Sequence, residues 1–444
     1  MIICVCCVLW ATALNPHRGV IKTYEVSNDL DYVLSQTEAK ADFDYFEKHL
    51  KSRHPLWLEE ETNVRNEIEK ALANGKELIE KINEIKVIDL WRIYSGILSL
   101  LHDGHTSIIW NKKNNQKFIN DFTQVINYGN PLFMDGVKTE EIFEIFKSLT
   151  SWEIEKSAES RFYGTYALSE HYERLCGIDT SDGVTFTYNI DGKNTDFHYD
   201  FVEGSKVIYP AEEKKVEKES EEVIKDEFDI HSEQIINEMY AFCNDKSVFY
   251  KIDYTYDLGL LVLTSCDYDK YYKETVKNFF DEVINKNISN VVVDLRGNGG
   301  GSSLVADEFI KYLNIDKFKS FDSAVRYGNF LMKNKDVVVK NPPVEQKFKG
   351  NVYVLTDIYT YSSAMDFAMF ITDNKLGTII GEASGNKPEC YGDRLDFMLP
   401  KSKLILTVSY KKWYRVDRSK SDQLIEPDIP CESKKALSKL YSML

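Results

Sequence analysis

The stretch NVVVDLRGNGGGSSLVADEFI, residues 290–310, decides the fold class because it joins a strand to a helix through a loop of glycines. Its β-branched run, 291–293, is typical of a strand that is covered on both faces. Four glycines then fall within the five positions 297–301, and the next residues have the apolar spacing of a helix. This order predicts a buried strand that ends in a loop from which the chain turns back as a helix.

Strands and helices alternate through the rest of the C-terminal part. We expect strands in 251–266, 351–357 and 376–384, helices in 273–287 and 365–374, and a closing hairpin over 393–416. Because parallel strands need crossover connections, this alternation predicts an α/β layer structure with a largely parallel sheet.

The N-terminal part has a different pattern. Residues 30–105 and 138–176 carry apolar residues at helical spacing, and 183–209 alternates around IDGKN as a hairpin does. The run 210–229 alternates charge sign and has almost no apolar content, so we assign it no chemistry. We therefore expect an apolar leader (1–14), a helical domain (15–110), a mixed middle region (111–250) that contains the charged insertion, and a core domain (251–444).

Composition excludes some functions. The 444-residue chain has a formal net charge of -16, which argues against a nucleic acid partner, because phosphate binding needs a basic surface. The cysteines form no pair of CxxC motifs, so we expect neither a zinc site nor a dense disulfide framework.

The first fourteen residues, MIICVCCVLWATAL, carry no charge. They are too few to span a bilayer, which needs about 20 apolar residues, so no stable membrane span is expected. They match the apolar centre of a secretory signal, which predicts a secreted or surface-held protein. A buried first strand or helix is the alternative interpretation.

The glycine loop can bind an anion through its backbone N–H groups. A phosphate is disfavoured, because the loop fits neither GxGxxG nor a glycine-lysine-serine pattern. The oxyanion of an acyl transfer is the other candidate, since it needs backbone N–H donors. A tight turn between strand and helix is the structural alternative.

The second motif is TYSSAMDFAMF, residues 360–370. A serine between a strand and a helix can expose its oxygen at the sheet edge, where the helix N-terminus stabilises negative charge. Ser362 or Ser363 can equally be a helix N-cap, with Asp366 close to completing a capping box. The residues alone leave both interpretations open.

A nucleophilic serine needs a base. LLHDGHTSI supplies His102 and His105 where a predicted helix ends, and GEASGNKPECYGD supplies Lys387. Each of them can instead be an ordinary surface residue. The two histidines could also bind a metal ion, but no third ligand is evident, so no metal site is predicted.

Together these motifs resemble one family. DLRGNGGG (294–301), YSSAMDFA (361–368), GEASGNK (381–387) and IEPDI (425–429) occur in the order seen in the S41 serine peptidases, the tail-specific or C-terminal processing proteases. LHDGHT (101–106) resembles the branch of chlamydial protease-like activity factor and the tricorn core. The resemblance implies a ClpP/crotonase-like α/β spiral with a helical N-terminal domain and a small β-containing middle region.

The resemblance also implies roles for residues. Ser363, directly before an alanine and three before an acidic residue, matches the nucleophile, and the amides of Gly300 and Ala364 match the oxyanion donors. His105 matches the base of one branch, whereas Lys387 matches the lysine of the other. Because Pro388 departs from the lysine branch, we favour His105.

The orienting carboxylate would be Glu426, with Asp422 as the alternative. The expected activity is serine endopeptidase hydrolysis of protein or peptide substrates without a cofactor. A PDZ glycine-rich loop is not recognisable between 106 and 250. A non-catalytic protein similar to interphotoreceptor retinoid-binding protein, which binds apolar ligands, and an acyl-CoA enzyme of the crotonase fold are the alternatives.

Overall fold

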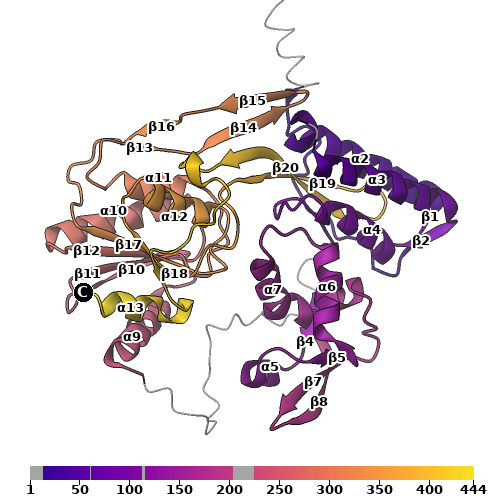
Figure 1. Cartoon of the computed structure of the whole chain (residues 1–444), viewed down its shortest axis with the longest axis horizontal. Coiled ribbons are helices and arrows are strands. Elements are labelled where there is room, and N and C mark those ends of the chain that lie inside the picture. Colours follow the sequence, from indigo (N-terminus) through magenta and orange to yellow (C-terminus); the bar gives the residue numbers. More distant parts are fainter. Residues whose placement is uncertain (1–13, 61, 113–115, 204–224) are drawn as a thin grey trace, which may run out of the picture. The chain divides into compact units, whose positions relative to one another are not determined.

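The computed structural model describes residues 14–60, 62–112, 116–203 and 225–444. The predicted leader, apart from residue 14, and most of the charged insertion lie outside these residues. The chain forms two compact units (Figure 1). Unit 1 comprises Met1–Lys218, Ala324–Met332 and Tyr391–Lys412, and unit 2 comprises Glu219–Ser323, Lys333–Cys390 and Trp413–Leu444.

Unit 2 is built on a six-stranded sheet in the order β10-β11-β12-β17-β18-β21. The strands are β10 (Val248–Asp253), β11 (Leu258–Leu263), β12 (Asn290–Asp294), β17 (Asn351–Thr356), β18 (Thr378–Gly381) and β21 (Ile429–Pro430). β10 pairs antiparallel with β11, and each later pair is parallel. The predicted largely parallel sheet is confirmed.

Helices cover both faces of this sheet (Figure 1). They are α9 (Glu227–Phe242), α10 (Lys270–Asn285), α11 (Leu304–Ile310), α12 (Ser363–Asp373) and α13 (Ala436–Tyr441). Val291 and Val293 of β12 pack in one apolar core with α10, α11 and α12, whereas Val292 packs in a second core with α9 and α13. Since successive side chains of a strand point to opposite faces, this division explains why β12 is apolar throughout.

Smaller elements complete unit 2. The pair β13 (Lys317–Lys319) and β16 (Val338–Lys340) is antiparallel, and the short helices η4 (Arg418–Lys420) and η5 (Ser433–Lys435) lie near the C-terminus. Arg415 forms a buried ion pair with Asp373, at 2.9 Å, and also donates to the carbonyl oxygens of three residues in the segment 420–424. The last residue of α12 is thereby tied to the chain that follows the closing hairpin.

The helical part of unit 1 consists of β1 (Val33–Ser35), α2 (Gln36–Arg53), η2 (Pro55–Leu58), α3 (Asn63–Lys81), β2 (Glu84–Lys86) and α4 (Val87–Ser99). α2 begins with a capping box, in which Ser35 and Glu38 bond reciprocally to each other's backbone amides. The apolar faces of these helices form one core, with Phe43, Phe46 and Trp91 among its largest side chains. The predicted helical region 30–105 is confirmed.

A five-stranded sheet packs against this helical core. It has the order β15-β14-β20-β19, with β3 also paired to β20; the strands are β3 (Ser107–Ile109), β14 (Asp322–Tyr327), β15 (Phe330–Asn334), β19 (Cys390–Met398) and β20 (Ile405–Tyr414). Phe397, Leu406 and Val408 enter the helical core. The closing hairpin predicted from the C-terminal sequence is confirmed as β19 and β20.

The middle region of unit 1 has its own core. Its elements are β4 (Lys117–Ile119), α5 (Thr123–Tyr128), β5 (Phe133–Met134), β6 (Val137–Lys138), α6 (Thr139–Leu149), α7 (Glu155–Gly164), η3 (Tyr166–Leu168), α8 (Glu170–Leu175), β7 (Val184–Ile190), β8 (Lys193–Tyr199) and β9 (Phe201–Glu203). Asp191 and Gly192 join β7 to β8 with φ of 51° and 79°, as a two-residue hairpin turn requires. The predicted hairpin and the helical segment 138–176 are confirmed.

The predicted domain boundaries at 110 and 250 stay predictions, and the two compact units divide the chain differently because 324–332 and 391–412 belong to unit 1. Among the described residues, no helix is both long enough and apolar enough to cross a bilayer.

Candidate active site

The glycine loop after β12 and the loop before α12 meet at one edge of the unit 2 sheet. They do so because β12 and β17 are parallel neighbours, so their carboxyl ends lie side by side. Leu295 N donates to Leu355 O at 3.0 Å, and Tyr361 N donates to Asn298 O at 3.0 Å. The serine pair and the glycine loop are thus brought together although more than 60 positions separate 298 from 361.

Asn298 holds the glycine loop in shape. Its side chain is fully buried, donates from Nδ2 to Leu263 O at 2.7 Å and accepts from Gly300 N at 2.9 Å. Asp357, at the end of β17, accepts from Gly297 N with both carboxylate oxygens. Two polar side chains therefore fix the loop from opposite ends, and backbone groups that would be unsatisfied in the interior are paired.

Gly300 lies directly against the serine turn. Its φ is +102°, and a Cβ there would lie 2.7 Å from Ser362 Cβ, 2.9 Å from Tyr361 O and 3.0 Å from Ser363 N. Both the backbone conformation and the space therefore demand glycine at this position.

Ser362 is the residue just before α12, and it has a strained backbone with φ 53° and ψ -125°. Its amide donates to Asn386 Oδ1 at 2.7 Å, and the Asn386 side chain is fully buried. No side-chain capping bond is made at this helix start. Ser362 therefore occupies the predicted N-cap position without making a side-chain capping bond, and Ser363 already lies within the helix.

Ser363 is the first residue of α12 and is 6% exposed. Its hydroxyl donates to Gly301 O at 3.0 Å, so the proton faces the glycine loop. The helix N-terminus places partial positive charge beside this oxygen, which would stabilise a developing anion. The chemistry that this setting suits is nucleophilic attack by a serine, once its proton leaves the Gly301 carbonyl.

The two predicted oxyanion donors lie beside Ser363 in the chain fold but bond within their own turns. Gly300 N donates to Asn298 Oδ1, and Ala364 N donates to Tyr361 O at 3.1 Å. To bind an oxyanion, each amide would have to share or release its present acceptor. Their assignment stays a prediction.

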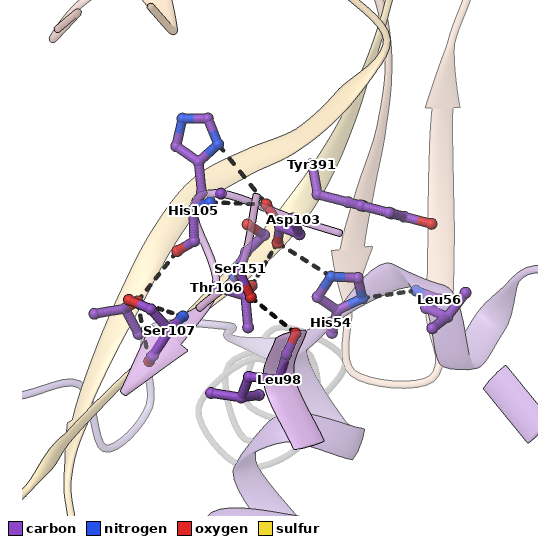
Figure 2. A network of polar contacts seen from close by, with 12 residues as sticks. His54, Leu56, Leu98, Asp103, His105, Thr106, Ser107, Ser151 and Tyr391 are labelled. Atoms are coloured by element: carbon purple, nitrogen blue, oxygen red, sulfur yellow. Dashed lines mark hydrogen bonds and ion pairs between the residues drawn. The ribbon is translucent and has the colours of Figure 1, made fainter. Parts of the chain in front are cut away.

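His105 belongs to unit 1, in the loop between α4 and β3 (Figure 2). Thr407 Oγ1 donates to its carbonyl at 3.1 Å, and its own amide donates to Asp103 Oδ1 at 2.9 Å. Its side chain is 16% exposed. Burial lowers the pKa of His105 below its ordinary 6.5, with Arg161 and Arg394 acting in the same direction and Asp103 opposing them. A neutral imidazole is the form in which histidine accepts a proton.

Asp103 lies fully inside unit 1, between two histidines (Figure 2). His54 Nε2 lies 3.3 Å from Asp103 Oδ2, to which Thr106 Oγ1 also donates, and His105 Nδ1 lies 3.8 Å from Asp103 Oδ1. Burial alone would raise the pKa of Asp103, but the hydrogen bond from His54 and the nearby imidazoles lower it to about 2. The carboxylate is therefore ionised at neutral pH.

The structure groups potential metal ligands differently from the sequence expectation. Ligand atoms of Asp103, His105 and Glu153 lie within 4.8 Å of one another, close enough for one cation. His102, the expected second histidine, is exposed, and its ring meets the Trp152 ring edge-on at 5.3 Å. Two carboxylates and one imidazole are ligands that a divalent cation accepts, but the same arrangement also serves to orient a histidine.

The other predicted residues are on the surface of unit 2. Lys387, Glu426 and Asp422 are all exposed. A lysine base needs a desolvated amine, so the setting of Lys387 is unfavourable for that role. Glu426 follows Ile425, whose carbonyl accepts a hydrogen bond from Ser384 N at 3.3 Å, so this segment runs beside the GEASGNK motif.

Sequence reasoning missed the buried polar residues that support the motifs. Asn298, Asn386, Asp357 and His54 make no motif of their own, but two of them lie inside quoted motifs, as Asn298 in DLRGNGGG and Asn386 in GEASGNK. An amide side chain in a glycine-rich loop was the available signal, because such a loop has backbone groups that need partners.

Comparison with known proteins agrees with this geometry. Residues 257–431 match the model of peptidase family S41. No curated protein matches the sequence. Solved structures of mature CPAF are similar in fold: one has a TM-score of 0.59 at 12% identity, covering 92% of this chain and 95% of that one. Mature CPAF complexed with lactacystin has a TM-score of 0.58 at 10% identity, covering 92% and 96%.

The fold of unit 2, the ordered motifs and the family match all lead to the same class of protein. The predicted α/β protease fold is confirmed, and the comparisons do not support the apolar-ligand-binding alternative. Residues 257–431, which match the model of peptidase family S41, are a serine-type peptidase domain.

Proposed function

We propose that the chain is an endopeptidase that hydrolyses peptide bonds through an acyl-enzyme on Ser363. The observation that carries the proposal is the setting of Ser363, at the start of α12 and directly against the glycine loop. Its oxygen attacks the scissile carbonyl after a base removes its proton. The tetrahedral oxyanion is stabilised by backbone amides, for which Gly300 and Ala364 are the candidates, and water then hydrolyses the acyl-enzyme.

His105 is the proposed base, and Lys387 is the alternative. Burial lowers the pKa of His105, so the imidazole is neutral and ready to accept a proton at neutral pH. Lys387 is exposed, whereas a lysine that acts as a base needs a desolvated amine. Glu426 is the proposed orienting carboxylate, with Asp422 as the alternative, on the strength of the family resemblance alone.

The proposed substrates are proteins or peptides, as for any peptidase, and the reaction needs no cofactor. We also propose that the protein is exported, on the strength of its uncharged apolar leader. Cell fractionation followed by amino-terminal sequencing tests this: protein outside the cell or on its surface supports export, and protein confined to the cell interior with an intact leader contradicts it.

Labelling with a fluorophosphonate probe tests the nucleophile. The native chain is compared with Ser363→Ala and with Ser362→Ala, which is a matched control because it changes the neighbouring hydroxyl in the same turn. Loss of labelling in Ser363→Ala alone supports the assignment. Loss in Ser362→Ala alone, or labelling of both variants, refutes it.

The same probe separates the two bases. His105→Ala should lower the labelling rate by at least about 100-fold, whereas Lys387→Ala should change it little, because general base catalysis contributes roughly 10²–10⁴-fold. The reverse result would assign the lysine mechanism. Lactacystin, with which mature CPAF has been solved in complex, is a second probe for the same variants.

A further inference from the structure

The loop that carries His105 also carries a carboxylate that faces it. His105 Nδ1 and Asp103 Oδ1 are 3.8 Å apart, and the same Oδ1 accepts the His105 backbone N–H at 2.9 Å. Figure 2 shows the two histidines, His105 and His54, on opposite sides of this carboxylate. Asp103 therefore stands next to the nitrogen that a base uses for orientation when the other nitrogen accepts the substrate proton.

His54 fixes Asp103 on the side opposite His105. His54 Nδ1 accepts a hydrogen bond from Leu56 N at 3.2 Å, which assigns the proton of a neutral ring to Nε2. That Nε2–H points to Asp103 Oδ2 at 3.3 Å, and Thr106 Oγ1 donates to the same oxygen. The side chains of His54 and Asp103 are both 0% exposed, so water does not compete for these bonds.

Other charged groups act on His105 from neighbouring elements. Arg161 and Arg394 lower the pKa of His105, and Asp393 raises it. Asp393 is 46% exposed and pairs with Lys411, and Arg394 is 57% exposed. Exposed charges act weakly because water screens them. Glu153 also lies near the ring, and it accepts a hydrogen bond from Gly104 N at 3.3 Å.

We propose that Asp103, fixed by His54, is a positioning residue that orients His105 during catalysis, in the role that the family resemblance gives to Glu426 or Asp422. The inference rests on the proposed function, since it gives His105 its role. At 3.8 Å the interaction is electrostatic, and a hydrogen bond needs about 1 Å of closure. Catalytic hydrogen bonds that are long without substrate often tighten when it binds. An imidazolium that forms beside a buried carboxylate is stabilised, so the effect grows towards the transition state.

A loop-building role for Asp103 is the competing explanation, and the variants separate the two. Asp103→Asn keeps the size of the side chain and an oxygen for the His105 amide, but removes the charge. Thr106→Val removes a hydrogen bond to the same carboxylate and the one that Thr106 Oγ1 accepts from Ser409 N, while leaving the charge of Asp103 in place. The second variant therefore measures what a weakened loop does by itself.

The rate of fluorophosphonate labelling is measured between pH 4 and 9 for the native chain and the variants. Asp103→Asn should lower the maximal rate by about 10²–10⁴-fold. The acidic limb of its pH–rate profile should also move to lower pH, because the negative charge that raises the pKa of His105 is gone. Thr106→Val should reduce thermal stability and leave the acidic limb where it is. His54→Gln should lower the maximal labelling rate by about 10–100-fold, because it removes the hydrogen-bond partner that fixes Asp103.

Two results overturn the proposal. One is an Asp103→Asn enzyme with the native rate and the native acidic limb. The other is loss of activity in Glu426→Gln with an active Asp103→Asn, which would assign orientation to the 425–429 segment. If the native chain does not label at all, the proposed function fails instead.

The effect of Asp103 on the pKa of His105 can also be measured without enzymatic activity. Histidine signals are titrated by NMR in Ser363→Ala with and without Asp103→Asn. A lower His105 pKa in the double variant supports the contact, and an unchanged pKa refutes it.

Discussion

The close approach of Gly300 to the serine turn makes Gly300→Ala the sharpest test of the proposed site. An alanine there would adopt a left-handed φ of +102°, which costs about 1–2 kcal/mol in a non-glycine residue. Its Cβ would also press on Ser362 Cβ at 2.7 Å and on Tyr361 O at 2.9 Å. Forcing extra atoms into a packed site costs about 1–3 kcal/mol more. The expected destabilisation is therefore about 2–5 kcal/mol.

The glycine loop supplies its own controls. Gly297 has φ +73° but nothing within 4 Å of its Cβ position, so Gly297→Ala measures the backbone cost alone, about 1–2 kcal/mol. Gly299 lies outside the left-handed region and also has free space, so Gly299→Ala should be within about 0.5 kcal/mol of the native chain. Denaturant unfolding of the four proteins, followed by tryptophan fluorescence, gives the three differences.

The same substitution should impair chemistry beyond its effect on stability. The atoms that must move are those of the turn before Ser363, and a displacement of about 1 Å in a catalytic group costs on the order of 100-fold in rate. Fluorophosphonate labelling at a temperature where every variant is folded measures this loss. If Gly300→Ala labels at the native rate and is as stable as Gly299→Ala, the described contact between the glycine loop and the serine turn is wrong.

Three further predictions follow from buried polar groups. Asn386→Ala removes the acceptor that holds the strained Ser362 amide, so unfolding measurements should show a loss of about 1–3 kcal/mol, with slower labelling. Because burial lowers the pKa of His105 below 6.5, the labelling rate at pH 6.5 should exceed half of its maximum and fall as pH drops through the lowered value; a midpoint above 6.5 would contradict this assignment. Arg415→Met leaves Asp373 buried without its guanidinium, since the two side chains are 3% and 0% exposed, and should cost about 3–5 kcal/mol in denaturant unfolding. The double variant with Asp373→Leu should recover much of that loss, and an equally unstable double variant would refute the explanation.

Local patterns in the sequence determined the elements and their class. The apolar run of β12, the glycines after it and the helix that follows were readable because strand and helix periodicity are properties of neighbouring residues. The same holds for the helices of unit 1 and for the hairpin of β7 and β8. The family resemblance rests on the order of four motifs, and it implies roles for Ser363 and His105.

The local sequence did not determine how the start of α12 is held. The capping interpretation of the serine pair follows from composition, but Ser362 has a left-handed backbone that is held by Asn386, 24 positions away, and Ser363 bonds to Gly301. Capping needs an extended residue with a free oxygen at the helix start. The close packing of the glycine loop leaves no such residue there.

The supporting polar network was decided only by the tertiary structure. Asp103 lies in the motif that was quoted for His105, but its partner His54 lies 49 positions earlier, and Asn298 acts on Leu263 from 35 positions away. No short motif contains both members of such a pair, because burial, and not sequence spacing, selects the partner. A buried polar group must find a hydrogen bond wherever the chain fold supplies one. The sequence therefore determined which segments carry chemistry, while folding decided which buried residues hold them in place.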